Sequence, residues 1–139
     1  MLIDKENITN YIPQRFPFVM IDTLISADEK GFKSTFAILA DNLFVEAGKI
    51  SESALVENIA QTCAAGFGYA NSLQGDGEAK LGFIGAVSKL SVHALPQPGD
   101  TITTEITLKN EFENVHLIEG VSFLAGEKLI ECQMKIVLA

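Results

Sequence analysis

The pattern of hydrophobic and polar positions predicts one long helix, from Ser51 to Leu73. Apolar residues recur there every three or four positions and cover nearly all sides of the helix. Such a helix is stable in water only if a sheet or other helices cover it. Ser51 or Ser53 is expected to cap its first turn by accepting a hydrogen bond from a backbone N–H. The expected buried rows are Leu55, Ile59, Cys63, Phe67 and Ala70, with Val56, Ala60, Ala64 and Gly68 beside them, and the thin polar stripe is Glu57, Asn58 and Gln61.

The remainder of the chain has the alternating pattern and the turn residues that are typical of strands. A short helix is expected at residues 4–12, with Asp4 as its cap and Pro13 ending it, and a loop at residues 44–50. Short turns separate the last four strands, so we expect these four to form an antiparallel meander with one face on the core. The expected strands are residues 18–27, 31–39, 81–94, 100–112, 114–125 and 128–138.

Composition and charge exclude several classes of protein. With 139 residues, 47% of them hydrophobic, the chain is expected to form one domain, residues 1–139, with a substantial core. Its formal charge of −8 argues against nucleic acid, which requires clustered Lys and Arg. Because no apolar run reaches the roughly 18–20 residues of a membrane span, and no secretion signal is recognisable, we expect a cytoplasmic location. Cys63 and Cys132 are too few for a disulfide scaffold or a tetrahedral metal site, and both are expected to be buried thiols.

One acidic residue, Glu57, stands out because it lies within the core helix. A carboxylate near the positive end of a helix is stabilised there by about 0.3–1 kcal/mol without having any function. Glu is nevertheless seldom placed on a buried helix unless it is paired or takes part in chemistry. Burial would also raise the pKa of its carboxyl towards the range that suits acid–base catalysis. The residues alone leave both interpretations of Glu57 open.

Four local motifs, in the right order, resemble those of the β-hydroxyacyl-acyl-carrier-protein dehydratases. Residues 12–22, IPQRFPFVMID, resemble the family's opening LPHRYPFLLVD, and residues 55–61, LVENIAQ, resemble its helix start IIEAMAQ. Gly85 falls where the family's GIDK strand begins, and residues 98–100, PGD, match a turn of the family. The resemblance covers nearly the whole chain. It implies an α+β hot-dog fold, with a six-stranded antiparallel sheet wrapped around one long central helix.

The same resemblance implies roles for particular residues. In the family a helix carboxylate, here Glu57, works with a histidine from the loop before the helix, contributed across a dimer interface. The histidine removes the α proton of a 3-hydroxyacyl thioester, and the carboxyl group helps the hydroxyl to leave as water. Gln61, one turn beyond Glu57, would hold that carboxyl, and a backbone amide at Gly85 would polarise the thioester carbonyl. The expected substrate-binding residues are Gly85, Phe44, Asn58 and Arg15.

The loop before the helix departs from the family pattern. Residues 44–51, FVEAGKIS, are several residues shorter than the family's FFxGHFPxxPxxPG and contain neither histidine nor proline. The usual base is therefore missing, and Glu46 and Lys49, nearest in sequence to its place, have the pattern of exposed loop charges. The two histidines, His93 and His116, fall in predicted strands, where packing or surface roles are more usual. The shortened loop also resembles the dehydratase-like proteins of aryl polyene and related pigment pathways.

Three functions therefore stay open. The first is a dehydratase of 3-hydroxyacyl chains held on an acyl carrier protein or coenzyme A. The second is a thioesterase in which Glu57 activates water. The third is an inactive subunit, which binds acyl chains or completes a heterodimer with an active dehydratase. No cofactor and no metal site are predicted. A homodimer or heterodimer is expected, because a six-stranded sheet leaves an unpaired edge, and the resemblance implies pairing through strand 81–94.

Overall fold

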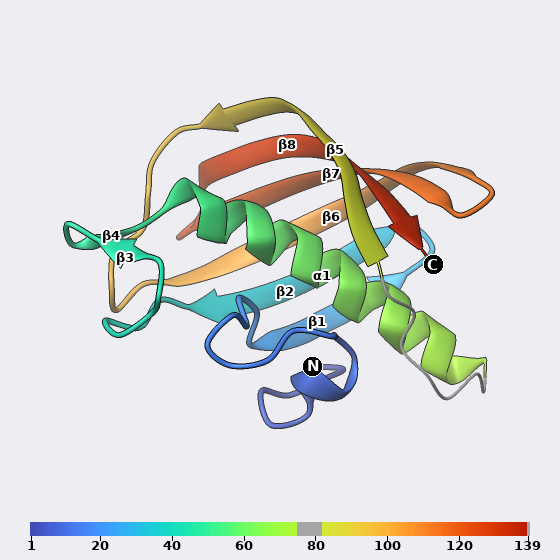
Figure 1. Ribbon diagram of the computed structural model, residues 1–139, viewed down its shortest axis with the longest axis horizontal. Coiled ribbons are helices and arrows are strands. Elements are labelled where there is room, and N and C mark those ends of the chain that lie inside the picture. The colour runs from blue at the N-terminus through green and yellow to red at the C-terminus, as the bar shows by residue number, and fades with distance from the viewer. Residues whose placement is uncertain (75–81, 139) are drawn as a thin grey trace.

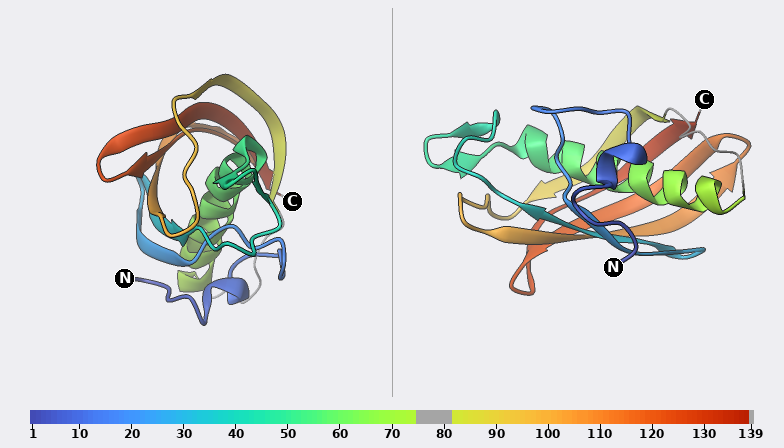
Figure 2. Two further views of the ribbon diagram at one scale, coloured as in Figure 1. Left: turned by 90° about the vertical axis from the view of Figure 1, so that its left-hand side faces the viewer. Right: turned by 90° about the horizontal axis from the view of Figure 1, so that it is seen from below.

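A six-stranded antiparallel sheet curls around one long helix, α1 (Glu52–Leu73), in the computed structural model, which describes residues 1–74 and 82–138 (Figure 1). Figure 2 shows α1 lying in the concave face of this sheet. The hot-dog architecture implied by the resemblance is thereby confirmed. The strands of the sheet are β1 (Thr23–Asp28), β2 (Gly31–Ala37), β5 (Gly82–Val92), β6 (Thr101–Phe112), β7 (Val115–Leu124) and β8 (Glu127–Leu138), and β3 (Val45–Glu46) and β4 (Lys49–Ile50) form a separate hairpin.

The first two thirds of α1 form the core, as predicted. Leu55, Ile59 and Cys63 are completely buried. Ser51 occupies the cap position, but its side chain makes no capping hydrogen bond. The predicted burial of Ala70 is wrong, because the last turns of α1 extend beyond the sheet and leave this residue exposed (Figure 1). The buried residues of α1 therefore lie between Ala54 and Gly68, a stretch that includes the turn with Glu57.

Two glycines allow α1 to approach its neighbours closely. A Cβ atom at Gly66 would lie 2.3 Å from the ring of Phe32 on β2. A Cβ atom at Gly68 would lie 2.6 Å from the carbonyl oxygen of Tyr11 in the N-terminal segment. Both distances are shorter than a van der Waals contact, so any side chain at these positions would push the helix away from its cover.

The predicted start of the first strand at Phe18 is wrong. In the structure this strand, β1, begins at Thr23. The backbone at Phe18 and Met20, before β1, bonds to side chains of α1, whereas Asp22 N–H, directly before β1, donates to the Thr35 carbonyl of β2 at 2.8 Å. Met20 N–H donates to Gln61 Oε1 at 2.7 Å, and Asn58 Nδ2 donates to the Met20 carbonyl at 2.7 Å. The polar stripe of the helix is thus covered by an extended segment that it holds in place.

Two short segments also differ from the prediction. The helix expected at residues 4–12 is a single 3-10 turn, Ile8–Asn10, in the structure. The loop expected at residues 44–50 contains the β3–β4 hairpin. Ala47 and Gly48 at its tip both have positive φ, +52° and +78°, which is the requirement of a two-residue type I′ turn.

The order of strands in the sheet, β1-β2-β6-β7-β8-β5, corrects the predicted meander. β6, β7 and β8 follow one another as expected, but β5 pairs with β8 and not with β6. The connection from β5 to β6 passes the N-terminal end of α1 (Figure 1), where the Pro96 carbonyl accepts from Ile50 N–H at 3.0 Å. Because prolines lack the N–H that a hairpin ladder uses, this stretch forms a long connection in place of a tight turn. β5 therefore lies at an edge of the sheet.

A chain of buried hydroxyl and amide groups joins α1 to the middle of the sheet. Thr104 Oγ1 donates to Asn58 Oδ1 at 2.5 Å. Because its single hydrogen is used in this bond, Thr104 Oγ1 accepts from Ser122 Oγ, which lies at 2.8 Å. Thr62 donates to the Asn58 carbonyl at 2.7 Å and accepts from Ser34 at 2.7 Å. All five residues are completely buried. Buried polar groups with satisfied partners specify one arrangement, so this chain fixes the rotation of α1 against the sheet.

Candidate active site

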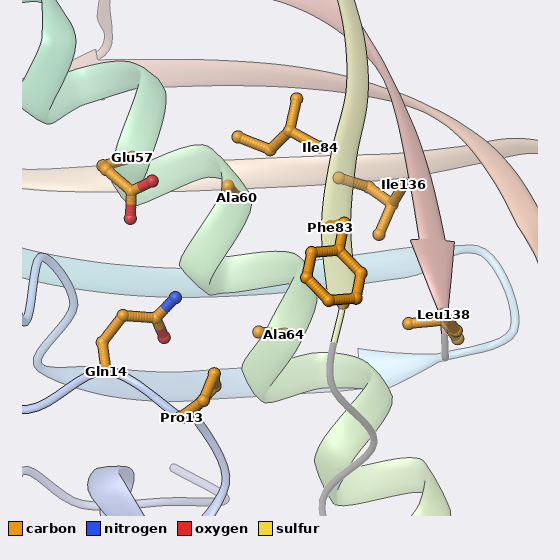
Figure 3. Close-up of a pocket in the computed structure, with 10 residues that line it drawn as sticks. Pro13, Gln14, Glu57, Ala60, Ala64, Phe83, Ile84, Ile136 and Leu138 are labelled. Carbon is orange, nitrogen blue, oxygen red and sulfur yellow. The ribbon is translucent and has the colours of Figure 1, made fainter.

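Glu57 lies at one end of a pocket between α1 and the β5–β8 edge of the sheet (Figure 3). The pocket has a volume of about 220 Å³. Ala60 and Ala64 follow Glu57 on the same helix face and form an apolar floor. Among the described residues that line the pocket, Glu57 and Gln14 alone bring polar side chains. The described lining residues are Pro13, Gln14, Glu57, Ala60, Ala64, Gly82, Phe83, Ile84, Ile136 and Leu138.

The Glu57 carboxyl is held by Gln61, as the spacing predicted. Gln61 Nε2 donates to Glu57 Oε2 at 2.7 Å and to the Phe18 carbonyl at 2.9 Å. Its Oε1 accepts from Met20 N–H at 2.7 Å. Gln61 is completely buried and Glu57 is half-buried. A side-chain amide with three fixed partners has little freedom, so the carboxyl that it contacts is oriented towards the pocket.

Three expected substrate-binding residues do not line this pocket. Asn58 is completely buried in the core, where both ends of its amide are bonded to protein groups. Arg15 is exposed, and its Nη1 donates to the carbonyls of Ile12 at 2.8 Å and Gln14 at 2.7 Å. Phe44 is half-buried in the segment just before β3. Asn58 therefore fixes the helix in the core and does not face the pocket. Arg15 and Phe44 are not brought to the Glu57 carboxyl.

Gly85, the expected carbonyl-binding position, lies at an irregularity of β5. The pairing of β5 with β8 passes from Ile84 to Ala86, so Gly85 is the extra residue of a bulge. Ile84, its neighbour, lines the Glu57 pocket. The bulge thus sets the Gly85 backbone next to the rim of this pocket and outside the regular ladder.

Neither histidine lines the Glu57 pocket. His93 follows β5, and its Nε2 lies 2.9 Å from Glu131 Oε2; this hydrogen bond lowers the pKa of Glu131. The ring of His116 lies 4.5 Å from the ring of Phe67, measured between centroids. Phe67 is ten residues beyond Glu57, which is about 15 Å along a helix. Both histidines are therefore engaged elsewhere in the molecule.

The charged residues nearest to the place of the missing histidine also lie elsewhere. Glu46 and Lys49 face each other in the β3–β4 hairpin, and both are exposed. Neither is among the residues that line the Glu57 pocket. In the part of the chain that the structure describes, this pocket therefore combines an oriented carboxyl with no histidine and no second charged group.

Gln14 is the residue of this site that sequence reasoning missed. It belongs to the motif at residues 12–22, but nothing in the pattern indicated that it lines the same pocket as Glu57. Within residues 1–74 and 82–138, no three His, Cys, Asp or Glu side chains are grouped so that they could hold a metal ion. α1 is too polar to cross a membrane, and no other described helix is long enough to do so.

Comparisons with known proteins identify the family. The model of the ApeP-like family, described as ApeP dehydratase, matches residues 6–137. A 3-hydroxyacyl-[acyl-carrier-protein] dehydratase FabZ from Latilactobacillus sakei is 21% identical over 143 residues, with 99% of each chain covered. Among solved structures, the dehydratase heterocomplex ApeI:P from Xenorhabdus doucetiae matches with a TM-score of 0.88 and 15% identity, over 95% of this chain and 90% of that chain. A hypothetical thioesterase with coenzyme A from Streptococcus pneumoniae matches with a TM-score of 0.66 and 9% identity, over 84% of each chain.

The two solved structures share the fold at low sequence identity, whereas the family model covers nearly the whole chain. It spans the N-terminal motif, the helix with Glu57 and Gln61, and all six strands of the sheet. The chain belongs to the ApeP-like dehydratase family.

Proposed function

We propose that this chain is a subunit of a 3-hydroxyacyl-thioester dehydratase, and that a second hot-dog chain supplies the base for its Glu57 site. The observation that carries the proposal is an oriented carboxyl in an apolar pocket that holds no histidine among the described residues. Dehydration needs both a base and an acid near the reacting carbons. The solved ApeI:P structure is a dehydratase heterocomplex, which supports a mixed dimer over a chain that acts alone.

In this reaction the substrate is a 3-hydroxyacyl chain held as a thioester on an acyl carrier protein or coenzyme A. The base of the second chain takes the α proton, the electron pair forms the double bond between C2 and C3, and the C3–O bond breaks. The Glu57 carboxyl group delivers a proton to the departing hydroxyl, which leaves as water. The Gly85 N–H stabilises the negative charge that develops on the thioester oxygen.

The apolar lining of the pocket supports an acyl substrate. Beyond Glu57 the pocket is bounded by Ala60 and Ala64 on one side and by Ile84 and Ile136 on the other. Such a lining favours a hydrocarbon chain, because apolar surface is removed from water on both sides. The thioester end then lies near Glu57 and Gly85, and the remainder of the chain extends along the helix.

The exposed edge of β5 supports the presence of a second chain. Every residue of β5 after Gly82 is exposed, although several carry large apolar side chains. An unpaired edge strand is a template for pairing with another chain. Pairing there would cover these side chains and bring a neighbouring subunit next to the pocket that β5 borders. The exposed apolar residues are Phe83, Ile84, Val87, Leu90 and Val92.

The first prediction concerns Glu57 and is tested by hydration of a trans-2-enoyl thioester. The chain is assayed alone and after co-expression with a hot-dog dehydratase subunit that carries the loop histidine. We expect turnover by the mixed assembly, and Glu57→Gln should lower it by about 10²-fold or more, the scale of one acid–base group. Glu46→Gln, which alters an exposed carboxyl near the same helix end, is the matched control and should have no effect.

Each other outcome selects a different function. Turnover that Glu57→Gln does not change would contradict the role of Glu57. Release of the free thiol, in place of hydration, would indicate the thioesterase. Acyl binding with no turnover in any assembly would indicate a non-catalytic subunit.

A further inference from the structure

We infer that Asn58 is a positioning residue for Glu57, which acts through the backbone of Met20 and the side-chain amide of Gln61 without touching the substrate. The inference deepens the proposed function and rests on it, because it concerns the carboxyl that delivers the proton. It gives the buried hydroxyl and amide groups a role beyond holding α1 on the sheet. The residues of this path, in order from the sheet, are Ser122, Thr104, Asn58, Met20, Gln61 and Glu57.

The first support is the way in which the backbone of Met20 is held. Its N–H donates to Gln61 Oε1 and its carbonyl accepts from Asn58 Nδ2, both at 2.7 Å. Met20 is completely buried and lies before the ladder that joins β1 to β2. Asn58 and Gln61 are three positions apart on one face of α1, so together they fix both ends of this residue. Without the Asn58 bond the Met20 carbonyl would be buried without its donor, and the segment would shift to find another.

The second support is the direction of the Gln61 amide. A side-chain amide has an oxygen that accepts and a nitrogen that donates two hydrogens. Because Met20 N–H occupies the oxygen, the nitrogen is the end that faces Glu57 Oε2, at 2.7 Å, and the Phe18 carbonyl, at 2.9 Å. If the amide were turned around, its oxygen would lie against a carboxylate oxygen, with no hydrogen between two acceptors. The position of Met20 therefore decides whether Glu57 meets a donor.

The third support is that Asn58 is itself held from the sheet. Thr104 Oγ1 on β6 donates to Asn58 Oδ1 at 2.5 Å and accepts from Ser122 Oγ on β7 at 2.8 Å. The Asn58 amide is thus fixed in the orientation that directs its nitrogen to the Met20 carbonyl. All three side chains are completely buried, and hydrogen bonds are electrostatically stronger in such surroundings than in water. Directed hydrogen bonds therefore connect the sheet to the carboxyl.

In the reaction, this arrangement reserves one oxygen of Glu57 for Gln61 and leaves the other to deliver the proton to the departing hydroxyl. A misplacement of a reacting group by about 1 Å can lower the rate by about 10²-fold. Neither Asn58 nor Thr104 is among the described residues that line the pocket. Asn58 therefore takes no part in the proton transfer, and its contribution is the position of the carboxyl.

A direct consequence is that removal of the Thr104 hydroxyl should affect turnover and not acyl binding. Thr104→Val keeps the branched shape of the side chain and removes the donor to Asn58 Oδ1. The variant is assembled with a second hot-dog subunit that carries the loop histidine and is assayed by hydration of a trans-2-enoyl thioester. We expect kcat to fall by about 10-fold, as for a displacement smaller than 1 Å, and KM to stay unchanged. Thr104→Ser retains the hydroxyl and should restore most of kcat.

Thr62→Val is the matched control. Thr62 is as completely buried as Thr104, and its hydroxyl belongs to the same group of buried polar side chains. It bonds, however, to the backbone carbonyl of Asn58 and to Ser34, and not to the amide that reaches Met20. The same substitution at this position should lower the free energy of unfolding to a similar extent and leave kcat unchanged.

A second measurement follows the Gln61 amide directly, in the chain alone. Gln61 is completely buried and its nitrogen donates to two acceptors, so the NMR signals of its side-chain hydrogens should exchange slowly with deuterated water. Thr104→Val should speed this exchange more than Thr62→Val does. Thr104→Ser should leave the exchange close to that of the parent protein.

Unchanged kcat in a folded Thr104→Val protein, an equal loss in Thr62→Val, or no recovery in Thr104→Ser would overturn the inference. If Thr104→Val does not fold, Thr104→Ala takes its place in both measurements, with Thr62→Ala as its control. Failure of the proposed function is seen separately. Absence of turnover in every assembly contradicts the dehydration, while the exchange of the Gln61 amide still decides whether Thr104 controls it. Glu57-dependent turnover that Thr104→Val leaves unchanged contradicts the positioning role alone.

Discussion

Individual polar side chains of α1 serve the fold and the candidate site together. Gln61 holds the Glu57 carboxyl and also the backbone at Phe18 and Met20. Asn58 bonds to Met20 on one side and to Thr104 on the other. The polar stripe of the helix is therefore an attachment surface for the segment that carries Gln14. A substitution that removes Gln61 would disturb both the carboxyl and this segment, so it cannot separate catalysis from folding as Glu57→Gln can.

The two cysteines carry a residue-scale prediction about alkaline stability. Both are free and buried, as predicted. Burial raises the pKa of Cys63 far above its ordinary value, with the neighbouring Cys132 adding to the effect, and raises that of Cys132 from 9.0 to about 11. The folded state thus keeps thiol protons that the unfolded state loses. Their contribution to the free energy of unfolding should be complete below about pH 9 and should decrease as the pH rises towards 11 and beyond.

Urea denaturation at several pH values between about 8 and 11 measures this dependence. The double variant Cys63→Ala, Cys132→Ala is the control, because it retains every other group that titrates in this range. Its stability should decrease less steeply with pH than that of the parent protein. Equal slopes for the two proteins would contradict the assignment to the thiols.

At the scale of elements, the close packing of α1 on β2 predicts the effect of a methyl group. Gly66→Ala raises helix propensity by about 1 kcal/mol but places a Cβ atom against the Phe32 ring. Overpacking costs about 1–3 kcal/mol, so we expect a lower free energy of unfolding. Ala70→Gly, on the exposed end of α1, measures the propensity effect alone and should destabilise the helix by about 1 kcal/mol.

A double variant tests the cause of this effect. In a Phe32→Ala background the ring is absent, so Gly66→Ala should become neutral or stabilising, and the two substitutions should couple strongly in a denaturation cycle. If Gly66→Ala destabilised the protein equally in both backgrounds, the contact with Phe32 would not be its cause.

At the scale of the whole molecule, the β5 edge predicts association with a second chain. We expect sedimentation to show a dimer, either of this chain or with a related hot-dog subunit. Val87→Lys with Leu90→Lys introduces two charges on β5 without altering a residue that lines the Glu57 pocket, and should give a monomer, because charged edge strands resist pairing.

Phe112→Lys is the matched control for this prediction. Phe112 is 76% exposed on β6, which is separated from β5 by β7 and β8. This substitution also replaces an exposed apolar residue by a charge and should leave the dimer intact. A parent protein that sedimented as a monomer, with and without a related subunit, would contradict association through β5.

The sequence by itself determined the features that depend on neighbouring residues. Helical periodicity placed α1 to within a residue, and turn residues located β6, β7 and β8 closely. The contact between Glu57 and Gln61 followed from their spacing of four, because such residues lie on the same face of a helix. The absence of histidine from residues 44–51 was also evident in the sequence.

Only the tertiary structure decided which distant segments meet. β5 pairs with β8, although paired residues lie between 38 positions (Val92 and Ile130) and 56 positions (Gly82 and Leu138) apart. Met20 bonds to Gln61 41 positions away, and neither contact has a periodic signal. Gln14 also reaches the Glu57 pocket through tertiary contacts, because side chains of the helix hold the backbone of the segment before β1 at Phe18 and Met20. Periodicity reports which face of an element is buried, whereas the partner on that face is chosen by packing and hydrogen bonding among all the elements at once.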